Sequence, residues 1–203
     1  MLKPENSALL LLAAGRSRRF GNADKLAVPY LGRPIGMHAV VALEAIPFAR
    51  RIAVIDGTSL PLAEAGYEVV VNDDPAAGLG RSLCLGAERV IDSGVDAVVI
   101  ALADMPLVTA AQVLRLFDAA DGVDSVVASS DGRIPRPPAL FGSAHFGALL
   151  GARGDQGMRP LIAAGRHVVT MPRELIDIDT PDDLAALERG LPTGRGGDAP
   201  NHP

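Results

Sequence analysis

The sequence predicts a three-layer α/β sandwich with a mainly parallel sheet. Short, nearly continuous apolar runs rich in β-branched residues recur along the 203-residue chain, which is typical of strands buried on both faces. Segments with helical periodicity separate these runs, and this alternation predicts right-handed βαβ units with helices on both faces of the sheet. Hydrophobic residues make up 48% of the chain and aromatic residues only 3%, so Ala, Val, Leu and Ile must build the core. The expected strands are residues 8–13, 52–55, 69–71, 97–102, 125–128 and 168–171.

Two of the expected helices begin at capping signals. Thr109 is a suitable N-cap for a segment with helical periodicity at residues 110–120. Thr180 precedes Pro181, a favoured first residue of a helix, and Asp183 completes a Thr-x-x-Asp capping box. We therefore expect one helix after each threonine.

Composition and organisation indicate one soluble domain. Residues 1–190 are predicted to form it, because no internal repeat or linker interrupts them, and residues 191–203, rich in Gly and Pro, are predicted to be a disordered tail. The net charge of -5 and the scarcity of aromatic residues argue against a nucleic-acid partner. The single cysteine, Cys84, excludes an internal disulfide. The first apolar run is too short to span a membrane and leads directly into a polar loop, so we expect a cytoplasmic protein with no membrane partner.

The loop after the first expected strand is strongly cationic. It holds Arg16, Arg18, Arg19 and Lys25, although the whole chain is acidic. Ligands of parallel sheets bind beyond the carboxyl ends of the strands, so these cations predict a polyanionic ligand such as a nucleoside triphosphate. The alternative is a solvated basic loop without a ligand, and Arg16 and Arg19 are expected to be exposed charges.

The same loop has small residues that let the backbone approach phosphates. Successive N–H groups can form an anion-binding nest, while Arg18 and Lys25 neutralise phosphate oxygens. It is not a Walker A loop, because no Lys-Ser or Lys-Thr follows a second glycine. The candidate nucleotide-binding residues here are Leu12, Ala13, Ala14 and Gly15.

A second glycine-containing loop precedes an expected helix N-terminus at Ser82. Gly78 and Gly80 resemble part of a dinucleotide-binding motif, but Leu83 stands where the third glycine belongs, which argues against a dehydrogenase. The turn could hold a ribose or a base edge by backbone contacts. A plain loop with an N-cap remains the alternative.

Two groups of carboxylates follow expected strands. Asp104 comes two residues after the run at residues 97–102 and is suited to binding Mg²⁺ on a triphosphate, with a simple turn as the alternative. Asp177 and Asp179 alternate on one face of an extended segment, and either could add a metal ligand. No nucleophile stands out. Nucleotidyl transfer needs none, because it depends on positioning and charge neutralisation.

Together these residues resemble the MobA-like nucleotidyltransferases, which attach a nucleoside monophosphate to molybdopterin. The similarity continues at residues 104–106, 154–159 and 177–181 and extends to about Leu187. The first loop matches the family signature at Ala13, Ala14, Gly15, Ser17, Arg18, Phe20, Gly21 and Lys25.

The resemblance implies a Rossmann-like nucleotidyltransferase fold and assigns roles to individual residues. Arg18 and Lys25 would grip the triphosphate, and Asp104 would bind Mg²⁺. Asp177 would lie beside the metal as a second ligand, with Asp179 as the other candidate.

The resemblance also implies the substrates. Members that use CTP tend to have Ala-Ala-Gly where members that use GTP have Ala-Gly-Gly, so residues 13–15 imply CTP. The stretch from Gly80 through Ser82 to Leu83 resembles the one that meets the base and ribose in CTP users. The chain departs from these members at residues 136–138, where Arg-Pro-Pro replaces a Gly-His-Pro near the acceptor pocket.

We therefore expect a Mg²⁺-dependent cytidylyltransferase that modifies the molybdenum-molybdopterin cofactor and releases pyrophosphate. A recipient molybdoenzyme similar to xanthine dehydrogenase is a possible partner. The alternatives are a guanylyltransferase acting on the same cofactor, a cytidylyltransferase acting on another phosphorylated small molecule, and a non-catalytic carrier of the cofactor.

Overall fold

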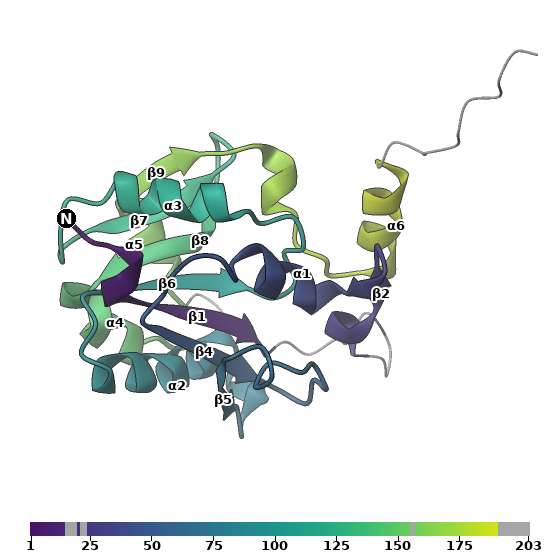
Figure 1. The fold of residues 1–203 in the computed structure, drawn as a ribbon, viewed down its shortest axis with the longest axis horizontal. Helices are drawn as coiled ribbons and strands as arrows, with labels where there is room; N and C mark the ends of the chain where they lie inside the picture. Colours follow the sequence, from purple (N-terminus) through teal and green to yellow (C-terminus); the bar gives the residue numbers. More distant parts are fainter. Residues whose placement is uncertain (15–19, 21–23, 155–156, 191–203) are drawn as a thin grey trace, which may run out of the picture.

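The computed structural model describes residues 1–14, 20, 24–154 and 157–190 (Figure 1). Two of the expected site residues, Gly15 and Arg18, lie outside these described residues, as does the expected tail at 191–203.

A seven-stranded sheet forms the middle layer, with the strand order β5-β4-β1-β6-β8-β7-β9. All neighbouring strands are parallel except at β8, which is antiparallel to both β6 and β7. The mainly parallel sheet predicted from the sequence is therefore confirmed. The strands are β1 Ser7–Ala13, β4 Arg50–Ile55, β5 Glu68–Val71, β6 Ala97–Leu102, β7 Val126–Ser130, β8 Pro135–Gly142 and β9 Arg166–Val169; a separate hairpin joins β2 Pro29–Tyr30 to β3 Arg33–Pro34.

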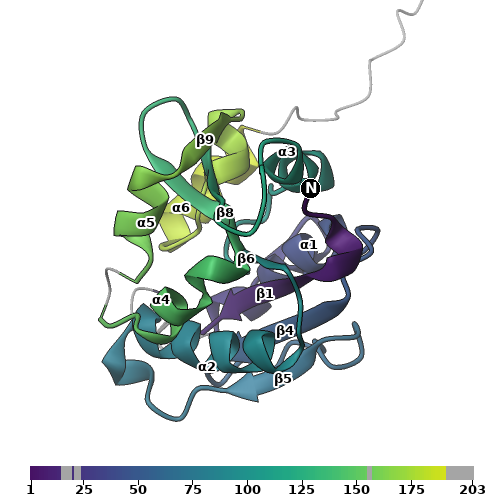
Figure 2. The same ribbon diagram turned by 90° about the vertical axis from the view of Figure 1, so that its left-hand side faces the viewer.

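Helices cover both faces of the sheet, which gives the three predicted layers (Figures 1 and 2). One face packs against α1 Ile35–Ala42 and α3 Ala110–Asp118, and the other against α2 Leu79–Asp92, α4 Phe146–Leu150 and α5 Arg159–Ala164. The last helix, α6 Pro181–Arg189, lies near the β2–β3 hairpin (Figure 1). Short 3₁₀ helices are η1 Pro4–Asn6, η3 Lys25–Ala27, η4 Pro75–Ala77, η5 Ser143–His145 and η6 Pro172–Leu175.

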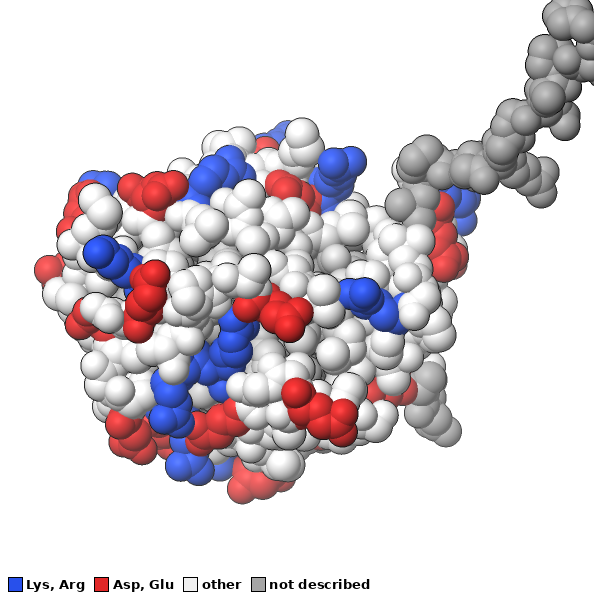
Figure 3. All heavy atoms as spheres, in the orientation of Figure 1, with Lys and Arg blue, Asp and Glu red and all other residues white. Residues whose placement is uncertain are grey.

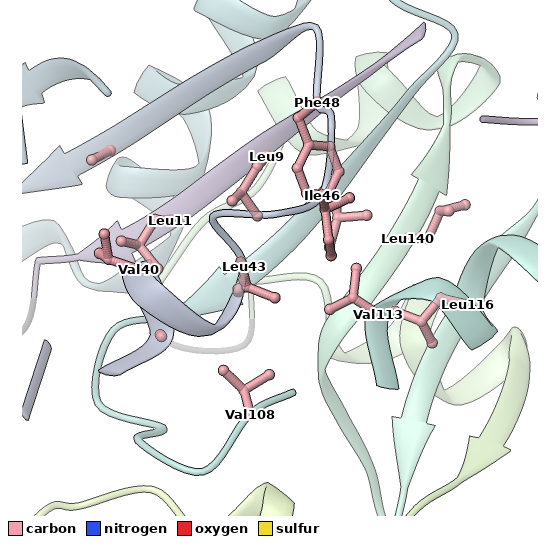
Figure 4. Packing of buried hydrophobic residues seen from close by; sticks show 14 of the residues in the cluster. Leu9, Leu11, Val40, Leu43, Ile46, Phe48, Val108, Val113, Leu116 and Leu140 are labelled. Atoms are coloured by element: carbon pink, nitrogen blue, oxygen red, sulfur yellow. The ribbon is translucent and has the colours of Figure 1, made fainter. Parts of the chain in front are cut away.

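Strand β1 is buried on both faces, as its apolar sequence predicts. Leu9 and Leu11 belong to the core cluster under α1 and α3, whereas Leu10 and Leu12 belong to the cluster under α2. Figure 4 shows Leu9 and Leu11 in the first cluster together with Val113 of α3. Each buried leucine contributes about 1.5–3 kcal/mol relative to an exposed one, so β1 is a rigid base for the loop that follows it.

The two predicted capping signals are confirmed. The Gln112 amide donates to Thr109 Oγ1 at 3.1 Å, and α3 begins directly after Thr109. At α6 the Asp183 amide donates to Thr180 Oγ1 at 3.1 Å, and the Thr180 amide donates back to Asp183 Oδ2 at 2.7 Å. These bonds satisfy amides that a helix N-terminus leaves without partners.

Other boundaries differ from the prediction. Helix α2 begins at Leu79 with Gly78 as its N-cap, so the expected helix start at Ser82 was wrong. Gly78 has a φ of +80°, a conformation that glycine adopts without the strain a side chain would bring. Strand β9 begins two residues earlier than expected, at Arg166.

Strand β8 was not expected, because its first half is rich in proline. These prolines lie where β8 has a partner on one side only: β6 pairs with it from residue 139 onward, whereas β7 pairs with it from Pro135. The β7 register also shifts between Ala128 and Ser129, opposite the prolines. Proline is tolerated in strands at such edges and irregularities, because no hydrogen-bond donor is needed there.

No helix within the described residues has both the length and the apolar character that crossing a membrane requires.

Candidate active site

The carboxyl ends of β1 and β6 meet at one edge of the sheet. The two strands are parallel neighbours, and Leu12 is paired with Leu102. The Ala103 amide donates to the Leu12 carbonyl at 3.0 Å, which fixes the chain just before Asp104. The cationic loop after β1 and the carboxylate after β6 therefore begin side by side, as the parallel arrangement predicts.

Lys25 links these two segments to a third one near the C-terminal end of the domain. Its Nζ lies 2.6 Å from Asp104 Oδ2 and 3.1 Å from Asp179 Oδ1, and it donates to the Ile178 carbonyl at 3.0 Å. Only 8% of the lysine side chain is exposed. The cluster therefore joins residues more than 70 positions apart in the chain around one buried ammonium group.

Neighbouring hydrogen bonds hold the cluster in place. The Ile178 amide donates to the Asp104 carbonyl at 2.9 Å, which docks the segment carrying Asp179 against the end of β6. On the lysine side, Asp24 Oδ1 caps η3 by accepting from the Leu26 amide at 3.0 Å, and Asp24 Oδ2 accepts from Thr58 Oγ1 at 2.6 Å. Lys25 therefore stands at the start of a short helix that is anchored to the segment after β4.

The electrostatics of the cluster favour a further cation. Burial raises the pKa of Asp104, and the nearby carboxylates of Asp177 and Asp179 raise it further, against the opposing effect of Lys25. Burial alone would lower the pKa of Lys25, but Asp104 and Asp179 outweigh it, so that pKa is raised and the ammonium stays charged. The three carboxylates of Asp104, Asp177 and Asp179 therefore carry more negative charge than the single ammonium group of Lys25 balances.

The donor atoms suit a hard divalent metal. Asp104 Oδ1 is buried and has no hydrogen-bond partner among the described residues. An unpaired carboxylate oxygen of this kind is a suitable ligand for Mg²⁺, which proteins commonly bind through one or two carboxylates together with substrate phosphates. The described part of the chain holds no group of three or more His, Cys, Asp or Glu side chains arranged as a complete metal site. A metal at Asp104 would take its other ligands from outside this set of side chains, for example from substrate phosphates and water.

The two C-terminal aspartates contact different cations. Asp179 lies against Lys25, whereas Asp177 Oδ1 lies 3.6 Å from Nη1 of Arg136 at the start of β8. Asp177 is close enough to Asp104 to influence its pKa, but Asp179 is the aspartate that shares the lysine. The resemblance implied that residues 136–138 lie near an acceptor pocket, but the contact of Arg136 with Asp177 was not predicted, because β8 itself was not expected.

The small residues of the first loop lie at the end of β1. Leu12 and Ala13 are buried and Ala14 is half-buried. Their nucleotide-binding role remains a prediction, and so do those of Gly15 and Arg18, which lie outside the described residues.

The second loop is tightly packed. The Gly80 amide donates to the Gly154 carbonyl at 2.9 Å, and a Cβ at Gly80 would come within 2.7 Å of the Arg153 backbone. Ser82 is buried, and its Oγ accepts a hydrogen bond of 2.9 Å from Asn72. The Leu83 side chain is fully buried in the core. Base and ribose contacts at Gly80, Ser82 and Leu83 remain predictions, and at Leu83 they could involve only the backbone.

The face shown in Figure 3 carries mixed charges. Blue basic and red acidic side chains alternate over it, without a broad basic area. Exposed basic and acidic side chains of this protein also form ion pairs, such as Arg50 with Glu68 at 2.6 Å. This face therefore offers no extended cationic surface of the kind that tracks a nucleic-acid backbone.

Comparison with known families identifies the chain. The family described as "MobA-like NTP transferase domain" matches residues 9–169, which include most of β1, Lys25 and Asp104. The chain belongs to this family. As a MobA-like protein it is a nucleotidyltransferase, and its fold and the meeting of Lys25 with Asp104 agree with that membership.

Three similar proteins illustrate the breadth of the MobA-like relatives. "Purine catabolism protein PucB" of Bacillus subtilis is 30% identical over 199 residues, covering 90% of this chain and 96% of that protein. A "Probable molybdenum cofactor guanylyltransferase" of Pyrococcus horikoshii is 28% identical over 163 residues, covering 78% of this chain and 80% of that protein. The crystal structure of Rv0371C of Mycobacterium tuberculosis in complex with manganese matches with a TM-score of 0.71 and 26% identity, covering 92% of this chain and 100% of that chain.

Proposed function

We propose that this nucleotidyltransferase transfers CMP from CTP to the molybdenum-molybdopterin cofactor and releases pyrophosphate. In this reaction an oxygen of the acceptor's terminal phosphate forms a new bond to the α-phosphorus of CTP. The bond between the α-phosphorus and the α–β bridging oxygen breaks, and its electron pair leaves with pyrophosphate. The observation that carries the proposal is the Lys25 ammonium held between Asp104 and Asp179 at the carboxyl ends of β1 and β6.

The residues of this cluster would act mainly by positioning charge. Lys25 is a buried ammonium group whose pKa is raised by Asp104 and Asp179, and its fixed position suits it to stabilise negative charge that builds up on the triphosphate during transfer. Asp104 would orient the lysine through Oδ2 and hold Mg²⁺ through its unpaired Oδ1. When bound, Mg²⁺ would neutralise phosphate oxygens and make pyrophosphate a better leaving group. Arg18 would supply a further cation from the first loop.

The descriptions of similar proteins support a divalent metal and the molybdenum cofactor as the acceptor. Manganese in the Rv0371C complex supports a divalent metal in this fold, and Asp104 Oδ1 supplies an oxygen ligand of the type that Mg²⁺ prefers. The Pyrococcus protein is named for the molybdenum cofactor, which supports that acceptor. The Bacillus protein is named for purine catabolism, which supports a recipient similar to xanthine dehydrogenase.

The choice of CTP over GTP depends on Ala14. The Pyrococcus relative is named a guanylyltransferase, so the family includes enzymes that use the other nucleotide. Ala14 is half-buried directly after β1, and it carries a methyl group that a glycine would lack. We propose that this methyl group favours the smaller pyrimidine base.

The test is to incubate the protein and Mg²⁺ with purified molybdenum-molybdopterin cofactor and each of the four labelled NTPs. We expect a labelled cofactor dinucleotide and pyrophosphate with CTP, and a rise in the ratio of GTP to CTP use in Ala14→Gly. Exclusive use of GTP by the unmodified protein would contradict the cytidine assignment. A tight complex with the cofactor but no product from any NTP would instead favour the carrier alternative.

A further inference from the structure

A pocket of about 550 Å³ lies next to the segment of the chain that carries Asp104. Leu102 and Met105, which flank Asp104 in the chain, form part of its wall. The start of β8 and the start of α5 form other parts, and most of the lining is apolar. The charged residues in the lining are Arg136, Arg159 and Asp177.

Arg136 is loosely held compared with a structural arginine of the same protein. Its Nη1 donates to the Leu175 carbonyl at 3.3 Å and lies 3.6 Å from Asp177 Oδ1, and Nη2 makes no hydrogen bond to the described residues. By contrast, Arg51 Nη2 donates to three backbone carbonyls, at 2.6, 2.9 and 3.2 Å. About a third of the Arg136 side chain is exposed, so its guanidinium has unused donors at the wall of the pocket.

The composition of the pocket indicates the chemistry of its ligand. Apolar walls fit an apolar or planar ring system, and a guanidinium with free donors fits a phosphate, to which it can donate two parallel hydrogen bonds. Arg159 lines the same pocket, is exposed, and forms no ion pair or hydrogen bond within the described part of the chain. Two arginines against one aspartate leave the charged part of the lining net positive.

We propose that Arg136 selects the acceptor by binding its phosphate monoester, with the body of the acceptor seated in this pocket and Asp177 as the counterion that the phosphate replaces. This inference rests on the proposed nucleotidyl transfer to a phosphorylated acceptor. It assigns Asp177 to the acceptor pocket, whereas Asp104 and Asp179 belong with Lys25. Arg136 is then a specificity-determining residue, and Asp177 lowers the affinity of Arg136 for the acceptor's phosphate by competing for the guanidinium.

Binding of a simple probe tests the inference without any nucleotide. Isothermal titration with phenyl phosphate, which joins a flat apolar ring to a phosphate monoester, is compared with titration with phenol, which lacks the phosphate. We expect Arg136→Gln to weaken the binding of phenyl phosphate about tenfold or more, because a charge-assisted hydrogen bond is lost. Asp177→Asn should strengthen it severalfold, because the competing carboxylate is removed.

The matched control is Arg133→Gln. Arg133 carries the same charge on the turn between β7 and β8, but its side chain is exposed and does not line the pocket. We expect this variant to bind phenyl phosphate as the unmodified protein does, and thermal unfolding confirms that each variant is folded. Equal affinities for the Arg136 and Arg133 variants would overturn the inference, and so would an unmodified protein that binds phenyl phosphate no better than phenol.

Turnover distinguishes failure of this inference from failure of the proposed function. With an acceptor that the unmodified enzyme uses, Arg136→Gln should raise the KM for the acceptor about tenfold while the KM for the NTP stays within about twofold, and Arg136→Lys should recover part of the loss. If no NTP is transferred to the molybdenum cofactor, the proposed acceptor is wrong, whereas the phenyl phosphate titrations still test Arg136.

Discussion

The side of this protein that we propose binds the nucleotide and the side that we propose binds the acceptor are built differently. Strands β5, β4, β1 and β6 form an all-parallel half of the sheet, and it ends at Lys25 and Asp104, whose ion pair is buried and 2.6 Å long. Beyond β6, the antiparallel β8 brings Arg136 to Asp177 at 3.6 Å, with both side chains partly exposed. The chemistry at a triphosphate is common to all nucleotidyl transfers and benefits from rigid geometry, whereas acceptors differ between enzymes. The more adaptable charge pair accordingly lies on the acceptor side.

The largest effect is expected from Asp104→Asn, on the nucleotide side. The amide cannot balance the charge of Lys25 or serve as an anionic metal ligand, so pyrophosphate release should fall at least about 100-fold. Asp177→Asn is the control, because it also removes one carboxylate near Asp104. It should retain most of the turnover at saturating acceptor concentration. Pyrophosphate release by both variants, with thermal unfolding to verify folding, makes the comparison. Unchanged release by the Asp104 variant would contradict the role of this pair.

A stability effect is expected at Gly80, where the N-terminal end of α2 touches the loop before α5. A Cβ there would lie 2.7 Å from the Arg153 backbone, so Gly80→Ala should lower the free energy of unfolding by about 1–3 kcal/mol. Gly147→Ala in α4 is the control, because nothing lies within 4 Å of its added Cβ. The free energy of unfolding of this variant should rise by up to about 1 kcal/mol, because alanine has a higher helix propensity than glycine. Urea unfolding of both variants measures the difference, and equal changes at the two glycines would mean that the loop before α5 is not packed against α2.

The smallest effect is expected on the acceptor side, at Glu174 in η6. Burial by itself would raise the pKa of this carboxyl, but hydrogen bonds from Thr170, the Met171 amide and Thr109 lower it below its ordinary value of 4.5. Its contribution to stability is therefore fully present above pH 4.5 and is lost as the pH falls through the lowered pKa. Glu174→Gln should flatten this part of the pH–stability curve. Thermal unfolding between about pH 6 and 3 tests it, and parallel curves for the two proteins would contradict the assignment.

Much of the fold could be predicted from the sequence, because local signals agree with the tertiary structure there. The run at residues 8–13 is buried on both faces, and Thr109 and Thr180 start helices where their side chains can cap. Strand β8 could not be predicted, because three prolines contradict a strand unless the position of its partners is known. That information depends on tertiary pairing, which the sequence pattern does not contain.

The candidate site could be predicted in part for a similar reason. Lys25 and Asp104 follow strands, and the topology of a parallel sheet brings such residues together without further information. The alternation of Asp177 and Asp179 indicated a shared face, but not which of the two meets Lys25. That choice is set by the hydrogen bond from the Ile178 amide to Asp104, which forms only when the segment docks. The resemblance implied an acceptor pocket near residues 136–138, but the other walls of the pocket could not be predicted, because they come from elements far apart in the sequence.

The position of the label after transfer tests the central claim most directly. The protein is incubated with Mg²⁺, the molybdenum cofactor and CTP that carries ³²P at either the α- or the γ-phosphate. If Lys25 and Asp104 support nucleotidyl transfer, the α-label should appear in the cofactor product and the γ-label in pyrophosphate, and both products should be lost in Asp104→Asn. Transfer of the γ-label to the cofactor, or transfer of the α-label that survives in Asp104→Asn, would contradict the account.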